Sequence, residues 1–190
     1  MKAIMLIFVM GLSGLSLFGQ VENSVDSETS KKLTRQQKIE QRRIEEEAMA
    51  KLVHQMVQDR QFVLEANYLG NQTGERIVVS SRINFIAVDS NKIVIQLASL
   101  SGIGGPNGMG GITAEGSVTG FDVKKLGKAQ NVYSIRLFTM TKIGSYDIFF
   151  SISPSGYADA TISGTTSGKL LYYGRVVPLK QSKVFKAMSI

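Results

Sequence analysis

A glycine-rich block in the middle of the chain limits the folds that this sequence can adopt. The segment from Ser101 to Gly120 reads SGIGGPNGMGGITAEGSVTG, with eight glycines in twenty residues, and it lies between runs that alternate like β-strands. Glycine costs backbone entropy inside a strand unless the fold needs a positive φ or a close approach of two backbones. The block therefore predicts a wide turn or a bulged strand within a β-sheet, and it does not indicate a reaction.

The first nineteen residues are typical of an export signal. Lys2 precedes an apolar run that extends to Met10, and a small residue, Gly19, stands where a signal peptidase would cut. We expect cleavage between Gly19 and Gln20, which would leave the mature protein in the periplasm or outside the cell. A membrane anchor is the alternative, but the run is shorter than the ~20 apolar residues of a spanning helix.

The chain has no cysteine. This excludes disulfides, thiolate metal sites, thiol nucleophiles and the lipid-bearing cysteine of a lipoprotein. A mature chain of roughly 170 residues has the size of one domain and can bury about two-thirds of its unfolded surface. We therefore expect one globular unit, stabilised by burial alone and without a cofactor.

The basic residues are scattered along the chain. The net charge is +7, and a basic balance can attract nucleic acid, anionic lipid or acidic glycan. Here the positive residues occur one or two per strand or turn, so a solvated surface is the favoured interpretation. Together with the export signal, this argues against a nucleic-acid partner.

A tether and a helix are predicted between the signal and the β-domain. Residues 20–33 are polar without a periodic pattern and predict a flexible tether. Residues 34–60 predict an α-helix, with Thr34 as N-cap and Gln37 completing a capping box. The first half of this helix is almost entirely charged. Its second half carries an apolar stripe that we expect to pack on the domain: Ile44, Ala48, Met49, Leu52, Val53 and Met56.

Residues 61–187 change to a period of two and predict an antiparallel β-domain of about eight strands. The clearest pair is formed by residues 76–88 and 92–99, which flank the short turn at 89–91. Connections this short join antiparallel neighbours. The predicted fold is mainly β (α+β), a meander closed into a barrel or folded into a sandwich, with the N-terminal helix covering an open end or face.

No group of residues predicts catalysis. His54, the only histidine, lies on the charged helix beside an apolar position, so a structural role is favoured over that of a general base. The carboxylates form no calcium-type cluster, and we expect no metal site. Glu115 and Asp122 border the glycine block and could in principle act as a glycosidase pair. Their separation of seven would put them on opposite faces of an ideal strand.

The glycine block lacks the Lys-Ser/Thr of a phosphate-binding loop. If the domain binds a ligand, we expect a pocket between the helix and a mouth formed by this block. Asparagine side chains there could donate to a ligand, although they could equally cap turns. The candidate binding residues are Asn84, Asn107, Gly108, Gly110, Gly111 and Glu115.

The order of these features resembles a known family. The strings RQFVLEANYL, SSRINFIAVDSNKIVIQLAS, GGPNGMGGITAEGSVTGFDV, YDIFFSISPSGYADATISG and LLYYGRVVPLKQSKVFKA are similar to the domain-of-unknown-function 4251 family, over roughly residues 40 to 187. The resemblance implies an exported single-domain protein from a Bacteroidetes-type bacterium. It implies no catalytic residues. Its most specific positions are Asn84-Phe85, Asn107 to Gly111, Ser155-Gly156 with Ala158, Tyr173-Gly174, Ser182 and Phe185.

Three classes of function agree with these features. The favoured one is a non-catalytic binding or structural module of the cell envelope, whose partner would be an envelope component or a small apolar or polar ligand. A hydrolase that cuts envelope glycans or peptides with strand carboxylates is the second. A small outer-membrane β-barrel is the third, although aliphatic residues would then have to form a continuous outer band.

Overall fold

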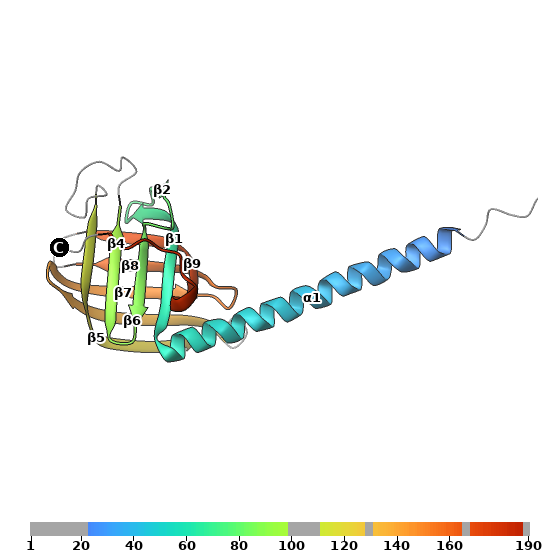
Figure 1. Cartoon of the computed structure of the whole chain (residues 1–190), viewed down its shortest axis with the longest axis horizontal. Helices are drawn as coiled ribbons and strands as arrows, with labels where there is room; N and C mark the ends of the chain where they lie inside the picture. Colours follow the sequence, from blue (N-terminus) through green and yellow to red (C-terminus); the bar gives the residue numbers. More distant parts are fainter. Residues whose placement is uncertain (1–22, 99–110, 128–130, 165–167, 188–190) are drawn as a thin grey trace, which may run out of the picture. The chain divides into compact units, whose positions relative to one another are not determined.

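The computed structural model describes residues 23–98, 111–127, 131–164 and 168–187, with side chains from residue 34 onward. The chain divides into two compact units, Met1–Arg42 and Arg43–Ile190. None of the helices in the described ranges is long and apolar enough to cross a membrane. The elements in chain order are α1 (Asn23–Asp59), β1 (Gln61–Asn71), β2 (Arg76–Val78), β3 (Phe85–Asp89), β4 (Lys92–Leu97), β5 (Ile112–Leu126), β6 (Val132–Thr141), β7 (Gly144–Ile152), β8 (Tyr157–Ser163), β9 (Lys169–Pro178) and the 3₁₀ turn η1 (Leu179–Gln181) (Figure 1).

The strands form a closed antiparallel barrel, which confirms the barrel alternative of the predicted fold. Each strand from β3 to β9 pairs with its neighbour in sequence, and β1 pairs with both β3 and β9. Because β1 bonds to the first and the last strand of this series, the sheet closes on itself. Eight strands make the barrel, and the short β2 lies alongside β1 beyond the end of β3.

The single strand predicted over residues 76–88 is interrupted. Tyr68 of β1 pairs with Val78, whereas Glu65, three residues earlier, pairs with Phe85, so residues 79–84 leave the sheet. Asn84 holds this excursion in place and is almost completely buried. Its Nδ2 donates to the carbonyl of Ser80 at 3.2 Å, and its Oδ1 accepts the N–H of Ala98 at 2.9 Å. The bond to Ser80 is local and competes with the sheet ladder, the bond to Ala98 ties Asn84 to the end of β4, and the strand breaks here.

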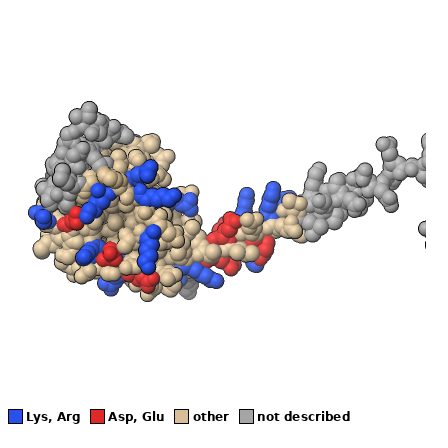
Figure 2. Space-filling model, in the orientation of Figure 1, with Lys and Arg blue, Asp and Glu red and all other residues tan. Residues whose placement is uncertain are grey.

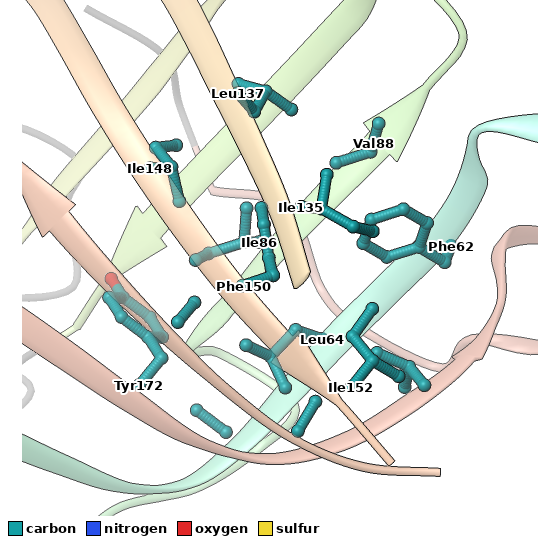
Figure 3. Close-up of a cluster of buried hydrophobic side chains, with 14 of the residues drawn as sticks. Phe62, Leu64, Ile86, Val88, Ile135, Leu137, Ile148, Phe150, Ile152 and Tyr172 are labelled. Atoms are coloured by element: carbon teal, nitrogen blue, oxygen red, sulfur yellow. The ribbon is translucent and has the colours of Figure 1, made fainter. Parts of the chain in front are cut away.

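The barrel interior is a packed apolar core. Inward residues alternate with outward ones along the strands, as on β7 and β8. Figure 3 shows side chains from several strands meeting in the interior. The labelled members of the cluster are Phe62, Leu64, Ile86, Val88, Ile135, Leu137, Ile148, Phe150, Ile152 and Tyr172.

The second half of α1 packs on one end of the barrel. Val53, Met56 and Val57 are buried in the same cluster as the strand residues. The Nδ1 of His54 lies 2.7 Å from the hydroxyl of Tyr133, at the start of β6. The helix thus covers the end where β1, β6 and β8 begin, and His54 has a structural contact there.

The helix starts earlier than the sequence predicted. It begins at Asn23, so most of the segment expected to be a tether before Thr34 has helical backbone. Residues 23–33 contain neither glycine nor proline, and nothing in their backbone chemistry ends a helix. Because these residues are polar and carry no periodic apolar stripe, the sequence pattern did not reveal that the helix begins at Asn23.

Candidate functional site at the barrel mouth

A cavity of about 320 Å³ opens at the barrel end opposite α1. It lies where β4 and β8 end and where β5, β7 and β9 begin. Its walls are mostly apolar, and among the described residues that line it Lys169, at the start of β9, is the one with a charge. The lining residues are Ile95, Leu97, Ile112, Ala114, Ile143, Tyr146, Ile162, Gly164, Gly168, Lys169, Leu170 and Tyr172.

Tyr172 closes the floor of the cavity. Its ring is fully buried in the core cluster, and its hydroxyl donates to the carbonyl of Gln96 at 3.0 Å. Burial raises the pKa of Tyr172 above its ordinary value, so the hydroxyl stays protonated and keeps donating. The hydroxyl of this floor residue is therefore engaged by the backbone of β4.

Small residues produce the hollow above this floor. Ala114 faces Ile95 across the β4–β5 pair, and Gly164 and Gly168 add no side chain at the rim between β8 and β9. Ile112 and Ile143 are left 40% and 37% exposed at the mouth. An apolar ligand would cover these two side chains, and each buried methylene group contributes about 0.8 kcal/mol.

Gly111 is needed at this rim for close packing of backbones. A Cβ added there would overlap the carbonyl group of Leu97 on β4. A Cβ added at Gly116, farther along β5, would likewise overlap the carbonyl of Met140. The glycine block thus contains the close backbone approaches that its composition indicated, at least at these two positions.

Among the predicted binding residues that the structure describes, Asn84, Gly111 and Glu115 are not part of the cavity lining. Asn84 is engaged in the excursion between β2 and β3, and Glu115 forms a 2.9 Å ion pair with Lys186 on the outer surface. Asn107, Gly108 and Gly110 lie outside the described residues. The expected pocket between the helix and the glycine block stays a prediction; the apolar face of α1 packs on the barrel end opposite this cavity.

Glu115 and Asp122 both lie on the outer face of β5, contrary to the expectation for an ideal strand. A bulge between Val118 and Gly120 shifts the register by one residue and reverses the side on which Asp122 emerges. The two carboxylates are still roughly 20 Å apart along the strand, too far for the ~5–10 Å of a glycosidase pair. Within the described ranges, no group of three or more His, Asp or Glu residues could hold a metal ion.

The cavity-lining residues that sequence reasoning missed include Tyr146, Lys169, Leu170 and Tyr172. Tyr146, Leu170 and Tyr172 are inward positions on β7 and β9. Alternation identified such residues as core. It could not show that the core stops short of one end of the barrel.

The comparisons with known proteins agree with this architecture. The family model described as "Domain of unknown function (DUF4251)" matches residues 44–176. The chain belongs to the DUF4251 family. A crystal structure of a DUF4251 family protein from Bacteroides eggerthii is similar, with a TM-score of 0.62 and 26% sequence identity over 73% of this chain and 93% of that chain. No functionally curated protein matches the sequence.

In this DUF4251 protein the family match includes the second half of α1 and most of the barrel. It extends from Ile44 to Val176, so it spans the mouth residues on β4, β5, β7, β8 and β9. Lys and Arg side chains are spread over the visible face of the barrel with Asp and Glu between them (Figure 2). The domain therefore presents a mixed-charge surface on that face and an apolar cavity at its mouth.

Proposed function

We propose that this DUF4251 protein is an exported, non-enzymatic binding module of the cell envelope, and that its barrel mouth holds the apolar tail of a small anionic amphiphile. The observation that carries the proposal is the apolar cavity of about 320 Å³, whose described lining contains one cationic residue, Lys169. This size lies at the lower end of the range for small-molecule sites, which are mostly apolar with few polar groups.

The lining chemistry selects the class of ligand. An alkyl tail would lie against Ile95, Leu97 and Ile162 above the ring of Tyr172, and burial of about eight methylene groups would contribute roughly 6 kcal/mol. An anionic head group would remain at the rim beside Lys169. An exposed ion pair adds only up to about 1 kcal/mol, so the tail should dominate affinity and the head group should set orientation.

Export rests on the sequence of residues 1–19, which has the three regions of a signal peptide. Cleavage after Gly19 would release a protein that begins with the polar residues before α1. A non-catalytic carrier or sensor of envelope amphiphiles fits this location. The distance along β5 between Glu115 and Asp122 counts against the hydrolase alternative.

The distribution of polarity also favours this proposal over an outer-membrane barrel. A membrane barrel has an apolar outer band and a polar interior. In this barrel the interior holds Ile135 and Leu137 on β6, whereas Arg136 between them is exposed on the outside. The same alternation places Asp159 outside and Ala158 inside on β8.

Displacement of a fluorescent probe by dodecanoate tests the proposal. The chain from residue 20 to 190 would be titrated with 1-aminoanthracene, and dodecanoate would then be added. We expect displacement by the wild-type protein. Ile112→Asp should weaken dodecanoate binding about tenfold, because it places a charge at the mouth. Its matched control is Ile77→Asp on β2, an exposed isoleucine outside the cavity.

A second pair of variants tests the role of the head group. Lys169→Gln should reduce the preference for dodecanoate over dodecanol, whereas Lys92→Gln, at the helix end of the barrel, should leave it unchanged. Absence of displacement by dodecanoate would refute the proposal. Equal effects of Ile112→Asp and Ile77→Asp would refute the assignment to the mouth.

A further inference from the structure

A second hollow, of about 430 Å³, lies on the outer surface of the barrel. Its lining residues come from β1, β2, β6, β7, β8 and β9 and from Ser153 after β7, and none of them lines the mouth cavity. Most of its lining consists of polar or aromatic side chains. We call it the outer groove, and its lining residues are Asn67, Tyr68, Arg76, Val132, Ser151, Ser153, Tyr157, Ala158, Asp159, Tyr173 and Gly174.

The centre of the outer groove is a row of side chains that are neighbours across four strands. Tyr68 of β1 pairs in register with Tyr173 of β9, Tyr173 pairs with Asp159 of β8, and Asp159 pairs with Ser151 of β7. Residues opposite each other in a sheet share a face. The sheet therefore positions two phenol rings, a carboxylate and a hydroxyl in one line on a rigid surface.

Two arginines lie on the rings of this groove. The guanidinium carbon of Arg76 is 3.9 Å from the ring centroid of Tyr173, and that of Arg175 is 4.6 Å from the centroid of Tyr157. Gly70 leaves room for the first stack, because a Cβ there would come within 3.1 Å of the Tyr173 ring. These contacts fix the arginines in place, which lowers the entropy cost of binding a ligand.

Large aromatic surface remains uncovered in the groove. Tyr157 is 61% exposed and Tyr68 is 48% exposed. Single exposed apolar residues are ordinary on a protein surface, but two exposed rings that line one polar hollow indicate a place of contact. Tyrosine combines apolar area with a hydroxyl at little cost in conformational entropy.

Asp159 is half-buried on the floor of the groove. Burial raises the pKa of its carboxyl group, while the hydrogen bond from Ser151 and the charge of Arg76 partly offset this rise. The carboxylate is thus incompletely solvated and can accept further hydrogen bonds. Donors from a ligand would restore the interactions that burial removes.

We infer that the outer groove binds a neutral saccharide chain, with sugar rings lying against Tyr157 and Tyr68 and sugar hydroxyls bonded to Asp159 and Arg76. A sugar ring has an apolar face of C–H bonds and a rim of hydroxyls that both donate and accept. The groove offers the matching groups: aromatic faces, a carboxylate that accepts and guanidinium groups that donate.

Other ligand classes fit this groove less well. A strongly anionic ligand would meet Asp159 on the floor, and a cationic one would meet Arg76 and Arg175 at the sides. A stable protein partner usually buries about 1,200–2,000 Å² in total, well beyond a hollow of this size. An alkyl chain would leave the polar groups of the groove without partners.

Titration of ¹⁵N-labelled protein with oligosaccharides tests the inference. The probes are cellotetraose, chitotetraose and maltotetraose, each added to the chain from residue 20 to 190. We expect at least one of them to shift the backbone amide signals of Tyr157, Asp159 and Tyr173, and to leave Ile112 and Leu170 at the mouth unchanged. Binding should persist when dodecanoate is present, which separates this site from the mouth.

Matched variants locate the contact. Tyr157→Ala should weaken binding at least about fivefold, as expected for loss of an aromatic anchor. Phe149→Ala, at an exposed aromatic residue outside the groove, is the control and should change it less than about twofold. If Tyr157→Ala fails to fold, Asp159→Asn with Asp122→Asn as control makes the same comparison. Failure of all three sugars to bind, shifts confined to the mouth, or equal effects of a variant and its control would overturn the inference.

Discussion

The side-chain oxygen of Gln96 accepts the backbone N–H of Ala187 at 2.7 Å. The same side chain donates through Nε2 to the carbonyls of Phe185, at 2.8 Å, and Ile83, at 3.0 Å. Gln96 is completely buried on β4 beneath the residues that follow η1. One amide thus attaches the C-terminal tail and the excursion before β3 to the outside of the barrel.

Replacement of Gln96 by leucine should therefore destabilise the domain. The change leaves the N–H of Ala187 and the carbonyl of Phe185 without partners, and each buried unsatisfied group costs about 1–3 kcal/mol. We expect the free energy of unfolding in urea to fall by about 2–4 kcal/mol, with loss of hydrogen-exchange protection at Ala187. Gln181→Leu, on exposed η1, is the control, and an equal loss in both variants would contradict this role.

Gly111 and Gly120 should respond differently to alanine. A Cβ at Gly111 overlaps the backbone of Leu97, which cannot move without distorting β4, whereas a Cβ at Gly120 meets only the ring of Phe138 at 3.0 Å. Gly111→Ala should lower the free energy of unfolding by about 2–3 kcal/mol and Gly120→Ala by less than about 1 kcal/mol. Thermal and urea denaturation measure the loss of stability in each variant. Similar values for the two variants would show that β4 and β5 do not approach so closely.

His54 and Tyr133 should be energetically coupled, because they join α1 to the start of β6 at 2.7 Å. A double-mutant cycle with His54→Ala and Tyr133→Phe should give a coupling of about 0.5–1.5 kcal/mol, the usual net value of one hydrogen bond. Urea denaturation of the two single variants and the double variant provides this number. Strictly additive losses would mean that the contact adds nothing to the docking of the helix.

Asp159 should make stability depend on pH. Its pKa is raised by burial, so the folded state holds the proton more tightly than the unfolded state does. The stability cost of the charged carboxylate is present above the folded pKa and disappears below the ordinary carboxyl pKa. We therefore expect Asp159→Asn to have a higher free energy of unfolding than wild type at pH 7. The difference should shrink as the pH falls from the folded pKa of Asp159 to the ordinary carboxyl pKa.

Denaturation of wild type and of Asp159→Asn at pH values from 3 to 7 checks this prediction. This pH range includes the ordinary aspartate pKa of about 3.9. Asp122→Asn is the control, because Asp122 is exposed on β5. A difference between Asp159→Asn and wild type that stays constant over the whole range would contradict the prediction.

The sequence predicted the antiparallel strands because they follow local patterns, but it left barrel and sandwich open. The hairpin at Ser90 is one example: the two-residue turn between paired Asp89 and Lys92 needs the positive φ of 55° that Ser90 adopts. The break between β2 and β3 was missed, since it depends on Asn84 bonding to Ala98, which is distant along the chain. Local periodicity carries no information on such a partner.

The candidate sites were harder to predict than the fold. The mouth cavity arises where inward residues from five strands fail to fill one end, and the outer groove arises where Tyr68, Tyr173, Asp159 and Ser151 share a row. Both depend on the register between strands, which a single sequence does not state. Exposure of Tyr157 is likewise a property of the assembled surface.

A methyl NMR titration shows whether the barrel mouth binds an apolar ligand. Isoleucine methyl groups would be ¹³C-labelled in the chain from residue 20 to 190, and dodecanoate would be added. We expect shifts at the mouth residues Ile95, Ile112, Ile143 and Ile162, with Ile77 on β2 and Ile135 in the deep core unchanged. Saturating dodecanoate that leaves all four mouth signals in place would contradict binding of an apolar ligand at the mouth.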